Sequence, residues 1–493
     1  MEQRASKRGV GMTDKKCDIA VAGVGVMGGN LALNMAGHGF SVAVYDPDAE
    51  KARALAQGKE GGGKIHAGGT VQELVAMLHR PRAVLLLVPA GKPVDDAIST
   101  LTPHFDKSDL IIDGGNSHFT DTNRREKLMA QSGMLFMGMG ISGGEYGARR
   151  GPSIMPGGPS DAYERVRKIL EASAAHVNGD PCVAHMGAGS AGHYVKMVHN
   201  GIEYGVMQLI SETYDIMKRG MGMSPGELAE IYSKWNGEEL NSYLIEITAD
   251  IFHYKDEKDP KLVLIDLILD RARQKGTGKW TSWDAMELEV PTPNVDAAVI
   301  MRNLSGYPDE RKKASEVLHG PEHRFKGDRA GMIGHLRNAC YAGMVMTYAQ
   351  GFALLKAASR SYEYGLDLET VARIWRGGCI IRAAVLEPIR TAFSRQSDLS
   401  NLLMDEHFSR EINARQKSLR TVVATAAELG VPSPGFSASL AYLDAYRSAW
   451  LPANLIQAQR DYFGAHTYER KDMPGKFLHT DWRPPAPASS RGA

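Results

Sequence analysis

Residues 18–30 read DIAVAGVGVMGGN and residues 42–46 read VAVYD, and these two stretches decide the fold. An apolar run, a glycine-rich turn, a helical spacing and a second apolar run, all within about thirty residues, predict strand, turn, helix and strand. In such a turn Gly23 permits the tight bend, Gly25 lets a pyrophosphate approach the backbone, and Gly28 lets the helix pack on the strand. The helix N-terminus then offers free N–H groups to phosphate oxygens. The two stretches therefore predict a dinucleotide site.

Asp46 follows the second apolar run and is placed to accept hydrogen bonds from both hydroxyls of an adenosine ribose. Its carboxylate would repel a 2′-phosphate on that ribose, and the next charged residues, Asp48 and Glu50, are also acidic. Lys51 and Arg53 lie a turn or so into the following helix. We therefore expect NAD as the preferred cofactor, with NADP as the alternative. On the glycine turn alone, an S-adenosylmethionine site and a turn without any ligand stay open.

Further apolar runs alternate with helical stretches in the first part of the chain. We expect strands at 83–88, 110–112 and 134–137, which indicates a doubly wound parallel sheet with helices on both faces. Past this region the strand pattern fades, and helical character runs from Ser190, an N-cap candidate, to Gly220, a C-cap candidate. The expected parts are a disordered lead-in (1–16), a dinucleotide-binding α/β domain (17–189), an all-helical domain (190–448) and a C-terminal tail (449–493), which closes on a disordered PPAPASSRGA.

Composition narrows the class of protein. Lys and Arg number 58 and Asp and Glu 57, so a net charge of +1 argues against nucleic-acid or membrane-surface binding driven by bulk charge. No run approaches the roughly 18 apolar residues of a membrane helix, and residues 1–16 lack the apolar core of a secretory signal. Four scattered cysteines without CxxC spacing fit a reducing compartment and argue against structural zinc. We expect a cytoplasmic protein that uses no metal.

The segment KMVHNGIEY (196–204) carries its polar groups at helical spacing. Lys196, His199, Asn200 and Glu203 fall on one stripe of the predicted helix. A solvated, salt-bridged face is the plain interpretation, but three glycines interrupt the helix, each at about 1 kcal/mol relative to alanine. These are Gly192, Gly201 and Gly205. Glycines tolerated there indicate close approach by a ligand or a backbone. In a partly closed site, desolvation lowers the pKa of an ammonium, so Lys196 could act as a base and Glu203 as a separate acid.

Other clusters look directed at anions. The stretches 142–144 (SGG) and 157–158 (GG) offer backbone N–H groups, and 275–279 (KGTGK) is similar to a flexible phosphate loop without matching the Walker A pattern. Each of them alone is more often an ordinary turn.

Together these pieces resemble the 6-phosphogluconate dehydrogenase family, over about residues 18–482. The matching stretches, in order, are GVGVMGGNLALNMAGHGF (23–40), IIDGGNS (111–117), SGGEYGARRGPSIMPGG (142–158), KMVHNGIEYG (196–205), QKGTGKWT (274–281), IWRGGCIIR (374–382) and QAQRDYFGAHTYER (457–470). The resemblance implies an α/β Rossmann-type N-terminal domain plus a large all-α C-terminal domain, with an extended C-terminal tail that reaches the partner subunit of a homodimer. It also implies oxidative decarboxylation of 6-phosphogluconate to ribulose 5-phosphate and CO2 in the pentose phosphate pathway and in gluconate utilization.

The resemblance assigns roles residue by residue. Lys196 would be the general base and Glu203 the acid, with no metal needed. The substrate-binding residues would be Asn116, Ser142, Gly143, Gly144, His199, Asn200, Tyr204, Lys275, Thr277 and Arg302, joined by Arg460 and His466 from the other subunit. The cofactor-binding residues would be Gly23, Val24, Gly25, Val26, Met27, Gly28, Asp46, Val88, Ala90 and Asn116.

The chain departs from the family pattern at the cofactor. NADP-using members typically carry Asn-Arg-Ser/Thr after the second strand, where this chain has Asp46-Pro47-Asp48, and Val-Lys-Ala-Gly where it has VPAG (88–91). Two alternatives stay open. A β-hydroxyacid dehydrogenase that does not decarboxylate would lack the phosphate-gripping Arg460 and His466. A non-catalytic dinucleotide-binding regulatory protein would be expected to have lost one of the catalytic residues.

Overall fold

The computed structural model describes residues 16–321 and 324–483. The chain divides into two units, with the boundary between Ser439 and Leu440. The predicted disordered lead-in lies outside the described residues except for Lys16, and so does the stretch 484–493. Each unit is described by itself below.

Within the described residues, the first unit is built on a seven-stranded sheet with the order β3-β2-β1-β4-β5-β6-β7. The strands are β1 (Ile19–Ala22), β2 (Val42–Tyr45), β3 (Ile65–Ala67), β4 (Ala83–Leu86), β5 (Leu110–Asp113), β6 (Leu135–Ser142) and β7 (Ser153–Gly157). Strands β1 to β6 pair in parallel, and the order 3-2-1-4-5-6 is that of the Rossmann-type dinucleotide fold. The predicted strands are confirmed within a few residues at their ends.

Helices cover both faces of this sheet, as the apolar strands predict. Along β1, Ile19 and Val21 pack into one apolar cluster, while Ala20 and Ala22 pack into the other. The helices that contribute to the first cluster are α1 (Val26–Gly37), α2 (Ala49–Gln57) and α7 (Ser160–Ser173). Those that contribute to the second are α3 (Val71–Ala76), α4 (Lys92–Leu101) and α5 (Phe119–Gln131). The carboxyl ends of the parallel strands therefore lie between two layers of helices.

Two features of the sheet were not predicted. Strand β7 runs antiparallel to β6, so the sheet is not wholly parallel, and it contains Pro156 and Gly157, which mask a strand pattern. Strand β3 has three residues, too few for a period to show. The short helix α6 (Gly144–Arg150) links β6 and β7, and a two-stranded ribbon of β8 (His176–Val177) and β9 (Asp180–Pro181) follows α7.

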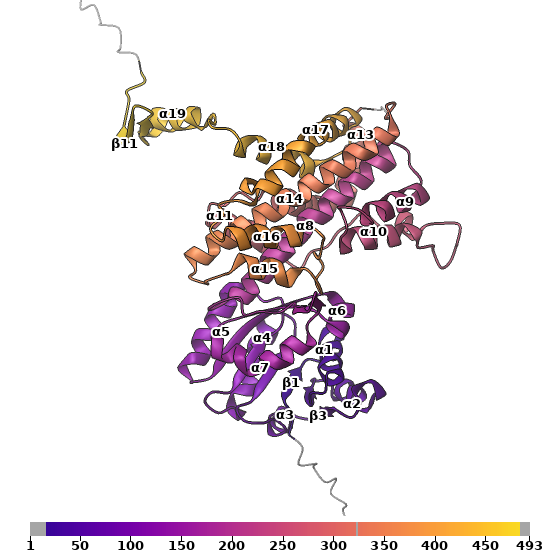
Figure 1. The fold of residues 1–493 in the computed structure, drawn as a ribbon, viewed down its shortest axis with the longest axis vertical. Coiled ribbons are helices and arrows are strands. Elements are labelled where there is room, and N and C mark those ends of the chain that lie inside the picture. Colours follow the sequence, from indigo (N-terminus) through magenta and orange to yellow (C-terminus); the bar gives the residue numbers. More distant parts are fainter. Residues whose placement is uncertain (1–15, 322–323, 484–493) are drawn as a thin grey trace, which may run out of the picture. The chain divides into compact units, whose positions relative to one another are not determined.

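The rest of the first unit is helical, as predicted. Helix α8 (Ala191–Asp215) continues as a π-helical turn, η3 (Ile216–Gly220), and lies beside the long α14 (Arg329–Ser361) (Figure 1). The other helices are α9 (Pro225–Asn236), α10 (Tyr243–His253), α11 (Thr277–Glu287), α12 (Pro293–Ser305), α13 (Pro308–Val317), α15 (Leu368–Trp375), α16 (Leu386–Arg395) and α17 (Glu406–Leu429). Helix α18 (Pro434–Tyr446) begins in the first unit and extends past its last residue, Ser439. Single 3₁₀ turns lie at η1 (Lys59–Gly61), η2 (Thr102–His104), η4 (Leu264–Leu267) and η5 (Leu402–Met404).

The predicted helix from Ser190 to Gly220 is confirmed in extent. Ser190 holds the N-cap position, but its hydroxyl pairs with that of Tyr364 at 2.8 Å and caps no backbone N–H. Gly220 closes the π-helical turn.

The second unit has more regular structure than the sequence indicated. It contains α19 (Ala453–Gly464) and a hairpin of β10 (Tyr468–Arg470) and β11 (Met473–Leu478). Asp461, on α19, is fully buried and accepts hydrogen bonds from the Thr467 and Thr480 N–H groups, both at 3.0 Å, and from Trp482 Nε1 at 2.8 Å. One buried carboxylate thus organises a segment whose apolar pattern is weak.

Candidate active site

Glycines let α8 cross the sheet at backbone contact. A Cβ atom at Gly140 would lie 2.4 Å from Lys196 Cβ, and one at Gly157 would lie 2.2 Å from the Gly192 nitrogen. From the helix side, a Cβ atom at Gly192 would lie 2.3 Å from the Met155 carbonyl oxygen. The close approach predicted from the glycines in this helix is thus an approach of backbone. It places Lys196 beside the carboxyl end of β6.

Gly201 and Gly205 also let neighbouring helices pack closely against α8. A Cβ atom at Gly201 would meet the Thr281 side chain of α11, and one at Gly205 would meet Thr347 of α14. Thr281 Oγ1 also donates to the Met197 carbonyl at 2.9 Å, which fixes α11 against α8.

Lys196 and Glu203 lie two helical turns apart on the same face of α8, and neither is solvated as the plain interpretation would require. Lys196 is 6% exposed and the Glu203 side chain 20% exposed. Burial lowers the pKa of Lys196, with the Glu203 charge opposing it, and burial raises the pKa of Glu203, with Lys196 and Arg302 opposing it. Both shifts favour the neutral amine and the neutral carboxylic acid, the forms that a base and an acid need.

His199 joins α8 to the end of β6. Its Nε2 lies 3.1 Å from Ser142 Oγ and its Nδ1 lies 3.1 Å from Asn200 Oδ1. The ring is fully buried, and burial, reinforced by the Lys196 charge, holds the pKa of His199 well below its usual range. An amide oxygen can only accept, so the proton is on Nδ1 and Nε2 accepts from the Ser142 hydroxyl. Ser142, His199 and Asn200 form one fixed group beside Lys196.

The other predicted residues of the sugar-acid end lie at the start of α6 and in the loop after β5. Gly143 has φ 127°, and a Cβ atom there would lie 2.5 Å from the Gly378 carbonyl oxygen, so glycine is required. Gly144 also has positive φ, with open space around it. Asn116 is exposed just after β5. Both of its neighbours in the chain donate to the Asp113 carboxylate, Gly115 through its N–H group and Ser117 through its hydroxyl.

Four predicted phosphate ligands come from three helices. The Arg302 guanidinium of α12 stacks on the Tyr204 ring of α8 at 3.4 Å. A Cβ atom at Gly278 would lie 2.4 Å from that ring, so the start of α11, with Thr277, also lies against Tyr204. Lys275 is exposed one residue before Gly276, whose φ of 102° marks the turn into α11. Stacking leaves the planar fork of Arg302 pre-ordered for phosphate oxygens.

Arg460 and His466 belong to the second unit. Arg460 lies on α19, where its Nη1 donates to Gln457 Oε1 at 3.0 Å, and His466 follows the helix. Both are exposed. Their role at the substrate phosphate stays a prediction.

The glycine turn has the geometry that a dinucleotide requires. Gly23 has φ 94°, and a Cβ atom there would lie 2.6 Å from the Leu87 carbonyl oxygen. A Cβ atom at Gly28 would lie 1.9 Å from the Gly23 carbonyl oxygen, whereas the space at Gly25 is open to 4 Å. Tight turn, helix contact and room for a pyrophosphate are thus at the expected positions, at the N-terminus of α1.

Beside this turn lies a cavity of about 520 Å³, lined by Gly23, Gly25, Asp46 and Val88 of the predicted set. The other predicted cofactor residues do not line it: Val24, Val26, Met27, Gly28, Ala90 and Asn116. The Val24 N–H group does donate to Asp46 Oδ2, at 3.0 Å. The sequence analysis missed the rest of the lining, which includes Tyr45, Pro47, Val71, Pro93, Ala97 and Thr100. Pro93, Ala97 and Thr100 lie on one face of α4, and their helical spacing is the feature of the sequence from which they could have been predicted. The lining suits an adenosine moiety.

The cations nearest Asp46 in sequence are already paired. Lys51 Nζ lies 3.7 Å from Asp48 Oδ2, and Arg53 pairs with Glu50. Asp46 itself uses Oδ1 to accept the Asp48 N–H at 3.0 Å. Its carboxylate is therefore held in place at the end of β2.

A Rossmann-type sheet, a glycine turn beside an adenosine-sized cavity, and a buried lysine and glutamate on the adjoining helix define a dinucleotide-dependent dehydrogenase. Two family models cover most of the chain. The NAD binding domain of 6-phosphogluconate dehydrogenase matches residues 18–187, and the C-terminal domain of 6-phosphogluconate dehydrogenase matches residues 192–482. The chain belongs to the 6-phosphogluconate dehydrogenase family, as its resemblance predicted, and it has a site for a nicotinamide dinucleotide.

Individual relatives agree over nearly the whole length. The chain is 52% identical over 469 residues to the NADP(+)-dependent, decarboxylating 6-phosphogluconate dehydrogenase of Bacillus subtilis, covering 95% of this chain and 99% of the relative. It is 52% identical over 462 residues to the decarboxylating enzyme of Synechococcus elongatus, covering 93% and 98%. The solved Plasmodium falciparum enzyme, studied with NADP+ and with 6-phosphogluconate, superposes with a TM-score of 0.91 at 46% identity, over 94% of this chain and 100% of that one.

Among the residues that the structure describes, no helix is both long and apolar enough to cross a membrane.

Proposed function

We propose that the chain oxidises and decarboxylates 6-phosphogluconate to ribulose 5-phosphate and CO2, and that it reduces NAD in preference to NADP. The observation that carries the reaction is the pair of Lys196, which is buried, and Glu203, which is mostly buried, on one face of α8; the pKa of the lysine is lowered and that of the glutamate is raised. Without such a pair, a dehydrogenase of this family could bind or oxidise the substrate, but it could not both accept the proton of the first step and donate the proton of the second.

In the first step the neutral Lys196 amine takes the proton of the substrate's 3-hydroxyl. The glycine turn and Asp46 would hold the nicotinamide dinucleotide, which would supply the acceptor for the hydride of C3. The Asn200 amide N–H group orients the hydroxyl and the carboxylate of the sugar acid, and His199, whose two ring nitrogens bind Asn200 and Ser142, holds that amide in place. The product of this step is a 3-keto acid and a protonated Lys196.

The second step releases CO2. The carbonyl at C3 is β to the carboxylate, so the electrons of the breaking C–C bond flow into that carbonyl. The Lys196 ammonium stabilises the developing enolate oxygen in a site from which water is largely excluded. Glu203, whose protonated form burial favours, then donates its proton to C1 of the enolate, which becomes ribulose 5-phosphate.

The substrate phosphate binds at the far end of the same face. Arg302 and the start of α11, with Thr277, lie against Tyr204 next to Glu203, and Lys275 precedes the turn into α11. We include Arg460 and His466 from the tail of a second subunit, which makes the enzyme a homodimer with exchanged tails. The four unpaired, buried cysteines support a reducing, cytoplasmic location.

The preference for NAD rests on Asp46. Its two oxygens accept the Val24 and Asp48 N–H groups, so the carboxylate is fixed beside the adenosine cavity, where a 2′-phosphate would be repelled. Lys51 and Arg53 are paired with acids and offer no free cation in exchange. The Bacillus subtilis relative is named NADP(+)-dependent, so this part of the proposal departs from a relative that is 52% identical.

Initial rates with 6-phosphogluconate, measured against NAD and NADP while released CO2 is trapped, test the proposal. We expect higher kcat/KM with NAD and one CO2 per reduced cofactor. Reduced cofactor without CO2 would indicate a β-hydroxyacid dehydrogenase that does not decarboxylate. A preference for NADP would overturn the role of Asp46 alone, and no turnover with either cofactor would overturn the reaction.

A further inference from the structure

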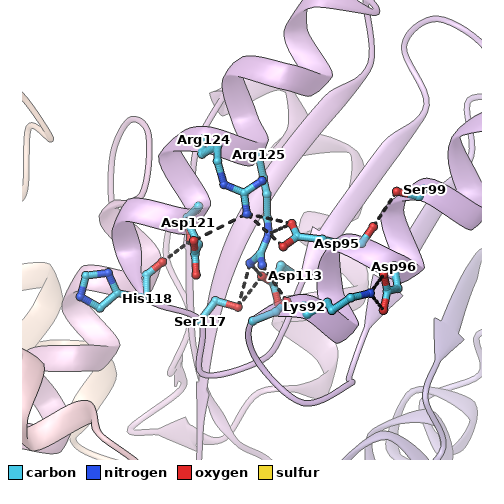
Figure 2. A network of polar contacts seen from close by, with 12 residues as sticks. Lys92, Asp95, Asp96, Ser99, Asp113, Ser117, His118, Asp121, Arg124 and Arg125 are labelled. Carbon is cyan, nitrogen blue, oxygen red and sulfur yellow. Dashed lines mark hydrogen bonds and ion pairs between the residues drawn. The ribbon is translucent and has the colours of Figure 1, made fainter.

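A buried arginine joins two loops that face the reaction site. Arg125, on α5, has a side chain that is 1% exposed, and it binds groups from three separate segments (Figure 2). Its Nε donates to Asp95 Oδ1 at 2.8 Å, and its Nη2 donates to the Gly91 carbonyl at 2.9 Å. Its Nη1 donates to Asp113 Oδ2 at 3.2 Å and to Ser117 Oγ at 3.3 Å. A buried guanidinium with its donors divided in this way fixes the relative position of all its partners.

One of these partners organises the loop that carries Asn116. The Asp113 side chain, also 1% exposed, accepts the Gly115 N–H at 3.1 Å and the Ser117 hydroxyl at 2.6 Å. These two contacts flank Asn116 on either side in the chain. Arg125 binds both Asp113 and Ser117, so it holds the two ends of this loop together. The Asn116 side chain between them stays exposed.

The other partners belong to the cofactor side. Gly91 ends the VPAG stretch after β4, in which Val88 lines the dinucleotide cavity, and Asp95 lies on α4, whose Pro93, Ala97 and Thr100 line the same cavity. Strands β4 and β5 are parallel neighbours, so both loops leave the same edge of the sheet. Arg125 bridges them just where cofactor and sugar acid must meet.

We propose that Arg125 is a positioning residue for hydride transfer: it locks the VPAG loop (88–91) to the DGGNS loop (113–117) and so sets the distance between the nicotinamide and C3 of the substrate. This inference rests on the proposed function. Hydride transfer needs the reacting atoms at about 3–3.5 Å, and a 1 Å error can lower the rate about 100-fold.

The neighbouring Arg124 provides a matched control. It is on the same helix, carries the same charge and also binds Asp95, through Nη2 at 2.9 and 3.0 Å to the two oxygens. Its side chain is 53% exposed, and its other acidic neighbour, Asp121, is on α5 itself. Arg124 therefore shares one partner of Arg125 and contacts neither loop (Figure 2).

The test compares Arg125→Lys with Arg124→Lys. Lysine keeps the charge beside Asp113 but cannot span four acceptors in one plane. With wild-type enzyme as reference, we expect Arg125→Lys to lower kcat about 10- to 100-fold and to raise the deuterium isotope effect with 3-deuterated 6-phosphogluconate. The affinity for ADP-ribose, which lacks the nicotinamide, should stay within about twofold, and Arg124→Lys should match wild type.

The outcomes separate this inference from the proposed function. No turnover by wild type would overturn the proposed function itself. An active wild type together with an unchanged kcat and isotope effect in Arg125→Lys would overturn the positioning role, as would an equal loss in Arg124→Lys. A parallel fall in ADP-ribose affinity and Tm would also overturn it, in favour of a structural role. If Arg125→Lys does not fold, Ser117→Ala removes one bridging contact and should still raise the isotope effect; an unchanged value would overturn the proposal.

Discussion

Gly140 lies directly against Lys196, so close that a Cβ atom on the glycine would lie 2.4 Å from the lysine Cβ. The same Cβ atom would lie 3.0 Å from the Gly192 carbonyl oxygen, and backbone cannot rotate out of the way as a side chain can. The position of Lys196 is therefore set by the absence of a side chain on a neighbouring strand. This relationship makes the proposed base, Lys196, depend on a residue that carries no chemistry.

Gly140→Ala should push α8 away from β6. We expect a loss of about 1–3 kcal/mol in the free energy of unfolding from overpacking, and a fall in kcat of about 10- to 100-fold from the displaced amine. Gly226→Ala, on α9 with open space around it, is the control; it should leave kcat unchanged and should not lower the free energy of unfolding. Denaturant unfolding and initial rates measure both effects. A Gly140→Ala enzyme with wild-type kcat would show that Lys196 tolerates the shift.

Lys196→Met should abolish turnover, because neither the removal of the hydroxyl proton nor the stabilisation of the enolate has a substitute at that position. Burial of the methionine should leave the fold intact. Lys168→Met, at an exposed position on α7, is the matched control. Stopped assays that detect both reduced cofactor and CO2 are the measurement, and an unchanged rate in Lys196→Met would refute the mechanism.

The pH profile of kcat/KM should be bell-shaped. On the acid side activity rises as Lys196 loses its proton, and the lowered pKa moves this limb below the 10.5 of an ordinary lysine. On the alkaline side activity falls as Glu203 ionises, and the raised pKa moves this limb above the 4.5 of an ordinary glutamate. Glu203→Gln should lose the alkaline limb and about 100-fold in kcat, whereas the exposed Glu230→Gln should keep both limbs. An alkaline limb that survives in Glu203→Gln would assign it to another group.

Asp46→Asn should shift cofactor choice toward NADP. Removing the charge ends the repulsion of the 2′-phosphate, so the ratio of kcat/KM for NAD to that for NADP should fall at least about tenfold, or about 1.4 kcal/mol. Asp18→Asn is the control at the opposite end of the central strands, where Oδ2 accepts the Ser41 N–H at 2.8 Å. If the ratio of kcat/KM for NAD to that for NADP does not change on Asp46→Asn, another residue determines the cofactor preference.

Glu212, on the same helix as Lys196, should make stability depend on pH. Burial raises its pKa to about 7, although Gln208 and the N–H groups of Gly435 and Phe436 stabilise the carboxylate. A pKa raised in the folded state gives a contribution that is full below about pH 4.5 and is lost as the pH rises through about 7. Between pH 5 and pH 8 (about the window of this titration) the unfolding free energy of wild type should fall more than that of Glu212→Gln. Parallel curves for the two proteins would contradict this expectation, and the exposed Glu316→Gln should follow wild type.

The sequence could predict those features of the fold and the site that depend on residues close together in the chain. The glycine turn, the first strands and the stripe of Lys196, His199, Asn200 and Glu203 depend on short spacings, and a spacing is visible in the chain itself. The fold class could be predicted for the same reason, because alternating strands and helices leave few arrangements.

The rest depends on which distant segments meet. Nothing near Gly192 reveals that the Met155 carbonyl will lie against it, and nothing near Arg125 reveals Gly91 and Asp113 as its partners. The antiparallel β7 was missed because its pairing with β6 is set by tertiary contacts rather than by its own composition. The burial of the polar stripe likewise follows from packing against the sheet, which a helical pattern alone cannot distinguish from a solvated face.

The placement of base and acid on one continuous helix makes the enzyme sensitive to the length of the chain rather than to its composition. Each residue added to or removed from an α-helix turns everything beyond it by about 100°. A single insertion between Lys196 and Glu203 would carry the carboxyl group to the side of α8 that packs away from the amine, even though every catalytic residue were still present. Length variants should therefore accumulate in the exposed loop at 255–260, and α8 should keep its residue count between these two positions.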